Sequence, residues 1–113
     1  MMSDSALSNG SASKHDLVVR CGELTIDLER FRVLLGHEPL MLSYREYALL
    51  LVLATHAGHV VSRRRLLEEG LGRHDFGGLR TVDEQVRHLK VKLERDRQVW
   101  IEDAGDGYRF VPQ

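Results

Sequence analysis

Residues 80–94, with the sequence RTVDEQVRHLKVKLE, are the stretch that decides the fold of this chain. Four apolar residues in it recur at intervals of three and four positions: Val82, Val86, Leu89 and Leu93. This spacing predicts an amphipathic helix that packs on a core by one narrow face. The residues that then point away from the core are Arg80, Glu84, Arg87, His88 and Val91. Such a helix can lie in the major groove of duplex DNA, where base edges and phosphates are within reach.

Two further helices are predicted before this one. Ser43 and Glu46 form a capping box ahead of the apolar run YALLLVLA, and Gly58 supplies a left-handed stop. This helix is apolar nearly all round, which predicts a buried central helix. At about fourteen residues it is too short to cross a membrane. Ser62 is the predicted N-cap of the next helix, which ends near Gly70.

The first turn of that next helix carries three cations, Arg63, Arg64 and Arg65. Positive charge at the positive end of a helix dipole lowers helix stability by roughly a few tenths of a kcal/mol per residue. A DNA phosphate bound at this turn would offset the cost. The alternative is a solvated basic turn without a ligand.

Short apolar runs on either side of the helices predict strands. Four of them are separated by turn candidates and predict a four-stranded antiparallel arrangement: residues 17–20, 24–28, 31–35 and 38–42. Pro39 cannot donate to a strand ladder and suits the last, edge-like strand. Towards the C-terminus, residues 99–101, the turn AGDG and the run YRFVP predict a β-hairpin. Tyr108 and Phe110 are expected to close the core against the helices.

Five sequence blocks together resemble the winged-helix DNA-binding domain of OmpR/PhoB-type response regulators: ELTIDLERFRVLL, LSYREYALLLVL, VVSRRRLLEEGLG, RTVDEQVRHLKVKLE and GDGYRF. The resemblance runs from about Leu17 to Phe110. It implies an α+β winged helix-turn-helix fold, with an N-terminal four-stranded antiparallel sheet, three helices and a C-terminal β-hairpin wing. It also implies a bacterial transcription regulator that binds duplex DNA in a sequence-specific manner.

The wing is where the sequence departs from this family. The family usually has a wing of the type Thr-x-Arg-Gly-x-Gly-Tyr, whereas residues 101–108 read IEDAGDGY, one residue shorter and without the arginine. Three carboxylates stand there instead: Glu102, Asp103 and Asp106. An acidic wing meets phosphates as like charge, at a cost on the order of 1 kcal/mol per close pair in water. The alternative function is therefore a winged helix that binds a protein, such as RNA polymerase or another regulator, with weak or no DNA affinity.

The resemblance and the exposed positions together give a set of candidate DNA-binding residues: Arg63, Arg64, Arg80, Thr81, Arg87, His88, Lys90 and Lys92. Arg87 can chelate O6 and N7 of guanine. His88 stands where the family often has arginine, so its contact would depend on pH. Lys90 and Lys92 suit phosphates, and the alternative for the whole set is a solvated face. Thr81 and Glu84 also form a predicted capping box at the start of this helix.

Residues 70–79, GLGRHDFGGL, link the second and third helices. In the resembling family this loop can contact RNA polymerase subunits, which makes Arg73, His74 and Asp75 candidate protein contacts; the alternative is a plain connector. Phe76 is expected to anchor the loop to the core. By analogy with the family, the chain is expected to occupy direct repeats as a head-to-tail dimer.

Composition excludes several other classes of function. A net charge of −1 over 113 residues argues against a protein that coats nucleic acid through overall charge. His56 and His59 are close in sequence, but no Cys or carboxylate completes a metal-ligand set beside them. Neither a phosphate-binding glycine loop with its lysine nor a nucleophile elbow is present. We therefore expect no enzyme activity, no metal and no cofactor.

Residues 1–15 are rich in Ser, Asn and Gly and are expected to form a flexible tail before a winged-helix domain at 16–113. Cys21 is the only cysteine, which excludes an internal disulfide and favours a reducing cytoplasm. No stretch approaches the ~20 apolar residues of a membrane span. The chain holds no room for a receiver domain, so we expect a stand-alone output domain, favoured by the Met-Met start, or a fragment of a longer regulator.

Overall fold

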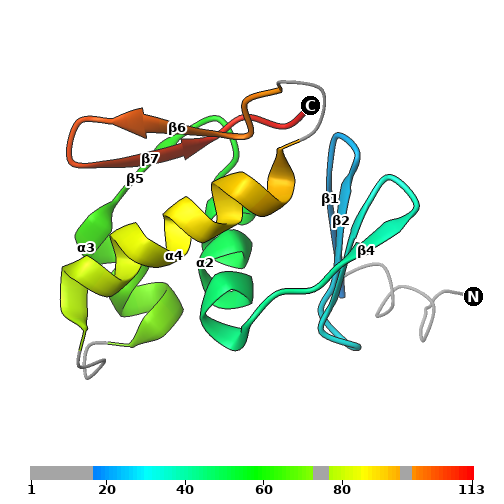
Figure 1. Cartoon of the computed structure of the whole chain (residues 1–113), viewed down its shortest axis with the longest axis horizontal. Helices are drawn as coiled ribbons and strands as arrows, with labels where there is room; N and C mark the ends of the chain where they lie inside the picture. Colours follow the sequence, from blue (N-terminus) through cyan, green and yellow to red (C-terminus); the bar gives the residue numbers. More distant parts are fainter. Residues whose placement is uncertain (1–16, 73–76, 95–97) are drawn as a thin grey trace, which may run out of the picture.

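The computed structural model describes residues 17–72, 77–94 and 98–113. Figure 1 shows three parts: an N-terminal antiparallel sheet, a group of helices beside it, and a C-terminal hairpin that lies along the helices. The residues of the predicted tail, 1–15, and the loop residues Arg73, His74, Asp75 and Phe76 lie outside the described residues. Within the described segments, no helix combines the length and hydrophobicity needed to span a bilayer.

The N-terminal sheet contains four short strands in sequence order: β1 (Val18–Cys21), β2 (Leu24–Asp27), β3 (Arg32–Leu35) and β4 (Glu38–Leu40). All neighbouring pairs are antiparallel, which confirms the predicted arrangement, with strand ends shifted by one or two residues. Leu24, Ile26, Val33 and Leu35 on its inner side are buried in the core. Arg20 is exposed on the opposite, outer side.

Helix α2 (Tyr44–Thr55) is the buried central helix that the sequence predicted. Its capping box is complete: Ser43 Oγ accepts a hydrogen bond from the N–H of Glu46 at 3.1 Å, and Glu46 Oε1 accepts one from the N–H of Ser43 at 2.9 Å. The chain turns away after the helix through Gly58, which has a φ of 85°. The capping box therefore fixes where α2 begins and leaves the Glu46 side chain at its first turn.

The next helical segment consists of α3 (Arg63–Leu66) and η1 (Leu67–Leu71). Ser62 is the predicted N-cap, and its Oγ accepts a hydrogen bond from the N–H of Arg65 at 3.1 Å. The segment ends as a π-helical turn close to α2. A Cβ at Gly70 would lie 3.0 Å from Leu49 Cδ2, which is tighter than an ordinary contact, so the glycine lets the two helices pack closely without a shift of Leu49.

Helix α4 (Gly78–Leu93) contains the decisive stretch of sequence. Val82, Val86, Leu89 and Leu93 are all fully buried, which confirms the predicted apolar stripe. The helix begins two residues before the predicted start, because Gly77 and Gly78 turn the chain into it and the N–H of Thr81 donates to the Gly77 carbonyl. Thr81 is therefore inside the helix, and the predicted capping box with Glu84 is wrong.

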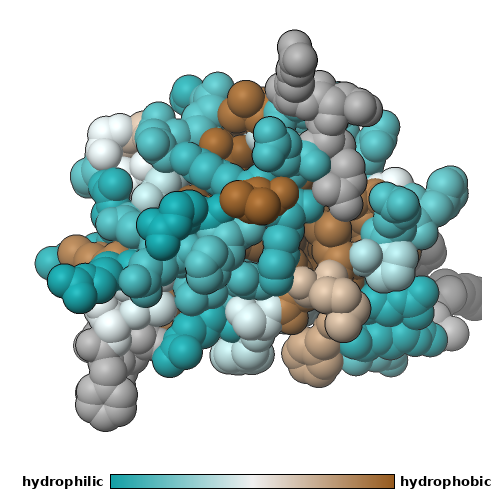
Figure 2. Space-filling model, in the orientation of Figure 1, coloured by the Kyte–Doolittle hydropathy of each residue, from teal (hydrophilic) through white to brown (hydrophobic). Residues whose placement is uncertain are grey.

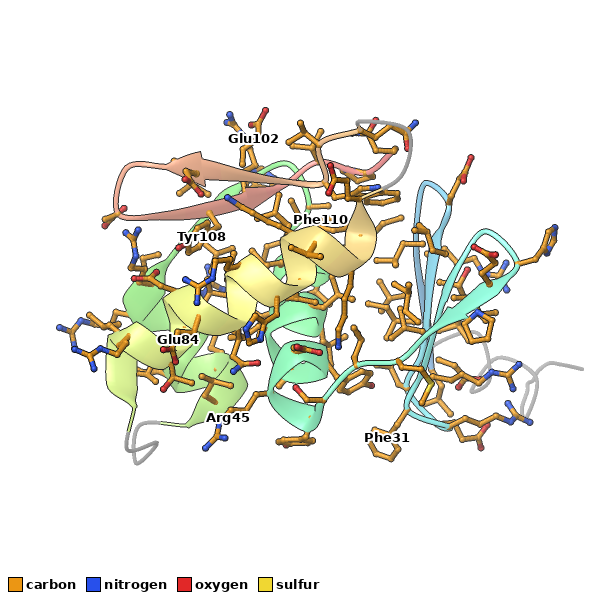
Figure 3. The ribbon with its side chains drawn as sticks, viewed as in Figure 1. Phe31, Arg45, Glu84, Glu102, Tyr108 and Phe110 are labelled. Atoms are coloured by element: carbon orange, nitrogen blue, oxygen red, sulfur yellow. The ribbon has the colours of Figure 1, made fainter. Side chains whose placement is uncertain are left out.

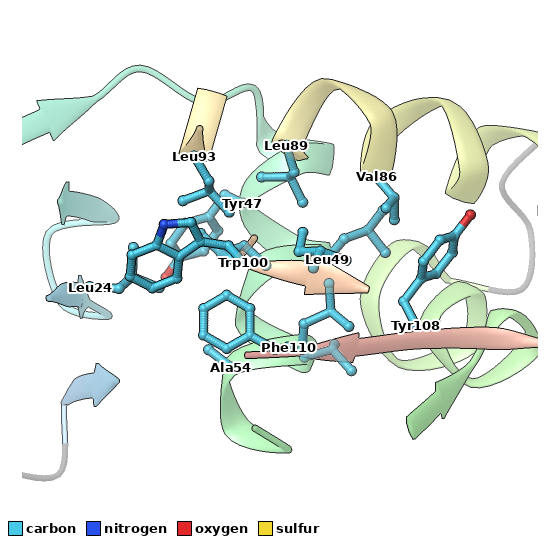
Figure 4. Packing of buried hydrophobic residues seen from close by; sticks show 14 of the residues in the cluster. Leu24, Tyr47, Leu49, Ala54, Val86, Leu89, Leu93, Trp100, Tyr108 and Phe110 are labelled. Atoms are coloured by element: carbon cyan, nitrogen blue, oxygen red, sulfur yellow. The ribbon is translucent and has the colours of Figure 1, made fainter. Parts of the chain in front are cut away.

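The wing consists of β6 (Ile101–Ala104) and β7 (Gly107–Phe110), and β7 also pairs with β5 (Val60–Ser62). The sequence did not predict β5, whose three residues sit between two helices. A Cβ at Gly107 would lie 2.0 Å from the Val61 carbonyl oxygen, so only glycine permits this pairing. Tyr108 and Phe110 are buried as predicted, and Figure 4 shows Phe110 and Trp100 packed with residues of α2 and α4.

Candidate nucleic-acid interface

The exposed side of α4 forms the centre of the candidate interface. The five residues expected to point away from the core are exposed: Arg80, Glu84, Arg87, His88 and Val91. The α3 segment lies near one end of this side and the wing runs along it (Figure 1). Figure 2 shows that the surface over these elements is largely hydrophilic. We call the exposed side of α4, together with the adjoining surface of the α3 segment and the wing, the α4 face.

Three arginines on and beside the α4 face have free guanidinium groups. Within the described residues, Arg64, Arg80 and Arg87 are exposed and make no side-chain hydrogen bond or ion pair. Arg64 comes from the first turn of α3, Arg80 from the start of α4 and Arg87 from its middle. A guanidinium offers five donors in a planar fork that fits phosphate oxygens or the O6 and N7 atoms of guanine. These side chains can therefore take up a ligand without losing an internal contact.

Arg63, in contrast, joins three elements of the fold. Its Nε donates to Asp83 Oδ1 of α4 at 2.7 Å, and its guanidinium carbon lies 5.2 Å from the centre of the Tyr108 ring of the wing. The Tyr108 hydroxyl donates to the same Asp83 oxygen at 2.6 Å. Burial alone would raise the pKa of Asp83, but the bonds from Tyr108 and Arg63 hold it below its ordinary value. Arg63 therefore positions α3, α4 and the wing relative to one another.

The basic first turn of α3 is thus compensated mainly inside the protein. Arg65 donates to Glu69 one helical turn later and also lies 3.0 Å from His56 Nε2. Together with the contact between Arg63 and Asp83, this leaves Arg64 as the cation of the turn with no partner in the described part of the chain. The sequence left a phosphate ligand and a solvated turn as alternatives. In the structure only Arg64 of these three arginines remains available to bind a phosphate without giving up a partner in the described part of the chain.

The opposite flank of α4 is joined to α2 through Glu46. The Glu46 side chain is only 5% exposed, its Oε1 accepts from Lys92 Nζ at 2.6 Å, and its Oε2 lies 3.4 Å from His88 Nδ1. Lys92 Nζ also donates to the Met41 carbonyl at 2.8 Å. Burial alone would raise the pKa of Glu46, but the Lys92 bond, the Ser43 N–H and the charges of Lys92 and His88 hold it below its ordinary value.

Two of the three wing carboxylates also have internal partners. Glu102 Oε1 accepts two bonds from Arg109, at 2.8 and 3.0 Å, and Asp103 Oδ1 accepts one from Lys90 Nζ of α4 at 2.7 Å. Figure 3 shows Glu102 on the side of the wing turned away from α4 and Tyr108 between the wing and the helix. The Asp106 side chain, at the tip of the wing, has no partner among the described residues. The predicted negative charge of the wing is thus concentrated at its tip.

The structure separates the predicted site residues into groups. Arg64, Arg80 and Arg87 lie free on the α4 face, while Arg63, His88, Lys90 and Lys92 each lie within 3.4 Å of a carboxylate. Thr81 is 9% exposed, so its side chain is not part of the face. The helix starts earlier than predicted, and this earlier start places Thr81 against the core.

Sequence reasoning missed the residues that position the site. Asp83 was not selected, and Glu46 was recognised only as a capping residue. Their partners are 20 and 46 residues away in sequence, respectively, so no local pattern signals these contacts. Across residues 17–72, 77–94 and 98–113, no group of three His, Cys, Asp or Glu side chains is arranged to hold a metal ion.

Sequence comparison places this arrangement in a known family. Residues 37–110 match the family described as "Transcriptional regulatory protein, C terminal". PhoB, the phosphate regulon transcriptional regulatory protein of Escherichia coli, is 38% identical over 96 residues, which cover 82% of this chain and 42% of PhoB. Sensory transduction protein RegX3 of Mycolicibacterium smegmatis is 33% identical over 88 residues, covering 78% of this chain and 39% of RegX3. The chain spans about two-fifths of the length of these relatives.

Solved structures agree with the sequence comparison. The DNA-binding domain of RstA from Klebsiella pneumoniae, in complex with the RstA box, aligns with a TM-score of 0.72 and 34% identity over 85% of this chain and 98% of that chain. The DNA-binding domain of CpxR from E. coli aligns with a TM-score of 0.72 and 30% identity over 84% and 96%. The chain belongs to the OmpR/PhoB-type family of winged-helix C-terminal domains of transcriptional regulatory proteins.

The Glu46 contacts predict a specific dependence of stability on pH. Because the folded-state pKa of Glu46 is lowered, its stabilisation is complete above the ordinary carboxyl pKa and is lost as the pH falls through the folded-state value. Replacing Glu46 by Gln should lower the free energy of unfolding at pH 7 by about 1–3 kcal/mol. The difference from the parent should shrink towards pH 3, as measured by urea unfolding.

The matched control is Glu84→Gln, which removes an exposed carboxylate of α4 that has no partner in the described part of the chain. This variant should follow the parent at every pH. A Glu46→Gln deficit of constant size from pH 7 to pH 3 would mean that the ionised carboxylate is not the stabilising group.

Proposed function

We propose that this chain binds duplex DNA in a sequence-specific manner and regulates transcription, acting in the bacterial cytoplasm without a catalytic step or a cofactor. The observation that carries the proposal is the set of three unpaired arginines on one surface: Arg64, Arg80 and Arg87. Arg63, Lys90 and Lys92 are held by carboxylates, and the three free arginines outnumber the unpaired carboxylate of Glu84, so this surface keeps a local positive charge although the whole chain is slightly negative. The related RstA domain was solved with its DNA element, which supports the proposal.

The positions of the arginines suggest separate roles. Arg87 lies at the middle of the exposed side of α4, where a recognition helix meets base edges in the major groove. Arg80 and Arg64 lie at the two helix starts, where they can hold backbone phosphates on either side of the groove. Val91 is 67% exposed on the same side and can contact a thymine methyl group.

Two partners beyond DNA complete the proposal. We infer a head-to-tail pair on direct repeats, with half-sites about one helical turn, 10 to 11 base pairs, apart. We also retain RNA polymerase as a partner of residues 70–79, with Arg73, His74 and Asp75 as contacts. Both partners are inferred from the likeness of this chain to the family.

Replacing Arg87 tests the base-reading role. Arg87→Ala should weaken binding to a preferred site by about 1–3 kcal/mol and relax the preference at one base pair. Arg64→Ala should weaken all sequences alike and reduce the salt slope of log K by about 0.9. Fluorescence polarisation with duplexes selected from a random pool measures both quantities.

Arg20→Ala is the control for this pair, because Arg20 is an exposed cation on the outer side of the N-terminal sheet. It should leave affinity and salt slope unchanged. If Arg87→Ala and Arg64→Ala lost the same amount of affinity for every DNA sequence, the assignment of base reading to Arg87 and phosphate contact to Arg64 would be contradicted.

A protein-binding winged helix is the second candidate function, and Asp106 is the observation that favours it. This carboxylate lies unpaired at the tip of the wing, where the family has an arginine that would enter the minor groove. A protein partner with a basic patch would meet this tip without electrostatic repulsion.

Replacing Asp106 by Arg separates the two functions. If the wing approaches DNA, Asp106→Arg should tighten duplex binding by roughly 1–3 kcal/mol, because it removes a repulsion and adds an attraction, and the gain should shrink as salt rises. Isothermal titration at two salt concentrations measures this. An unchanged DNA affinity, together with lost binding to RNA polymerase, would favour the protein-binding function.

A further inference from the structure

The ion pair between Lys90 and Asp103 differs from the other carboxylate contacts around the α4 face. Asp83 accepts bonds from two donors at 2.6 and 2.7 Å, and Glu46 is 5% exposed and has several partners. Asp103 is 73% exposed and has Lys90 as its one partner among the described residues. An exposed carboxylate with one partner gives up that partner to a competing anion far more easily than a carboxylate that is buried or has several partners.

Lys90 is placed to contact a phosphate if it is released. It follows Arg87 by three residues on α4, so the two side chains lie on neighbouring parts of the helix surface between the α4 face and the wing. Its ammonium also lies 5.7 Å from the centre of the Tyr108 ring, which supports the positive charge at this position. The ammonium group is 2.7 Å from Asp103, the distance of a charge-assisted hydrogen bond. A phosphate oxygen would make the same bond.

We propose that Asp103 sets the DNA affinity of this domain: it holds Lys90 in the free protein and is exchanged for a backbone phosphate when duplex binds. The inference rests on the proposed DNA-binding function and goes beyond it by naming an internal competitor. Because the exchange concerns a phosphate and not a base, it weakens binding to every sequence equally. The acidic wing then lowers the affinity for specific and non-specific duplexes by the same factor, so that at a given protein concentration only duplexes that also make base contacts, such as those of Arg87, stay occupied.

The test uses a double-mutant cycle on the full chain: the parent, Asp103→Asn, Lys90→Met and the double variant. Binding to a random duplex is measured by fluorescence polarisation at three salt concentrations. Asp103→Asn should tighten binding by the same factor, about 3–10-fold, at each of the three salt concentrations. In the Lys90→Met background the same change should alter affinity by less than about two-fold, because Asp103 acts through Lys90.

Two further variants distinguish the exchange from general charge effects. Glu102→Gln removes the same charge one residue away, but Glu102 is paired with Arg109 within the wing, so its effect should be small and independent of Lys90. Asp103→Glu keeps the carboxylate and should restore nearly the parent affinity. The salt slope of Asp103→Asn should equal that of the parent, because Lys90 meets a phosphate in both complexes.

Each other result overturns the inference. An equal gain with and without Lys90 would mean that Asp103 repels DNA directly. A salt slope steeper by about 0.9 in Asp103→Asn would mean that Lys90 stays on Asp103 in the parent complex. No gain at all would show that the pair does not compete with DNA. If none of the four proteins binds duplex at low salt, the proposed function fails and the inference fails with it.

Discussion

The buried carboxylate of Glu46 is the interaction on which the arrangement of the candidate interface depends. It caps α2 through the N–H of Ser43 and accepts a bond from Lys92 of α4, so it joins the start of the central helix to the end of the recognition helix. Removing a carboxylate from water is costly, and only a full set of partners offsets that cost. The apolar stripe brings α4 onto α2, while Glu46 restricts which way the helix faces.

The carboxylates of Glu46 and Asp83 decide which cations near α4 have internal partners and which are free. Glu46 holds one flank of α4 and Asp83 holds the other, through Arg63 and Tyr108. Cations on the two flanks are therefore used inside the protein, whereas Arg87, on the side between them, is left for a ligand. A chain with a net charge of −1 can thus present a local basic surface without being basic as a whole.

The sequence was sufficient for most of the fold, because most of its helices and strands depend on local patterns. The stripe from Val82 to Leu93, the capping residue Ser43 and the N-cap Ser62 each act within a few residues, and the structure confirms them. The strand at Val60–Ser62 was missed because its pairing with β7 is made more than forty residues away along the chain and needs the bare backbone of Gly107.

The candidate site was less predictable than the fold, because its side chains are held by partners that are distant in the sequence. Periodicity identified which residues of α4 are exposed, but it could not show which cations already have partners. The pairing of Lys92 with Glu46 spans 46 residues, and that of Lys90 with Asp103 spans 13. Thr81 was predicted to cap α4, but the helix begins earlier, at Gly78, with Gly77 as its N-cap, so Thr81 lies inside the helix.

The most direct test of the proposed DNA interface is a nuclear magnetic resonance titration of the labelled chain with a duplex of about 12 base pairs, long enough for one copy. We expect the largest changes at the side-chain N–H signals of Arg64, Arg80 and Arg87, with the signal of Arg20 on the outer side of the sheet unchanged. Changes concentrated on that outer side, with the signals of the three arginines unaffected, would contradict DNA binding by the α4 face.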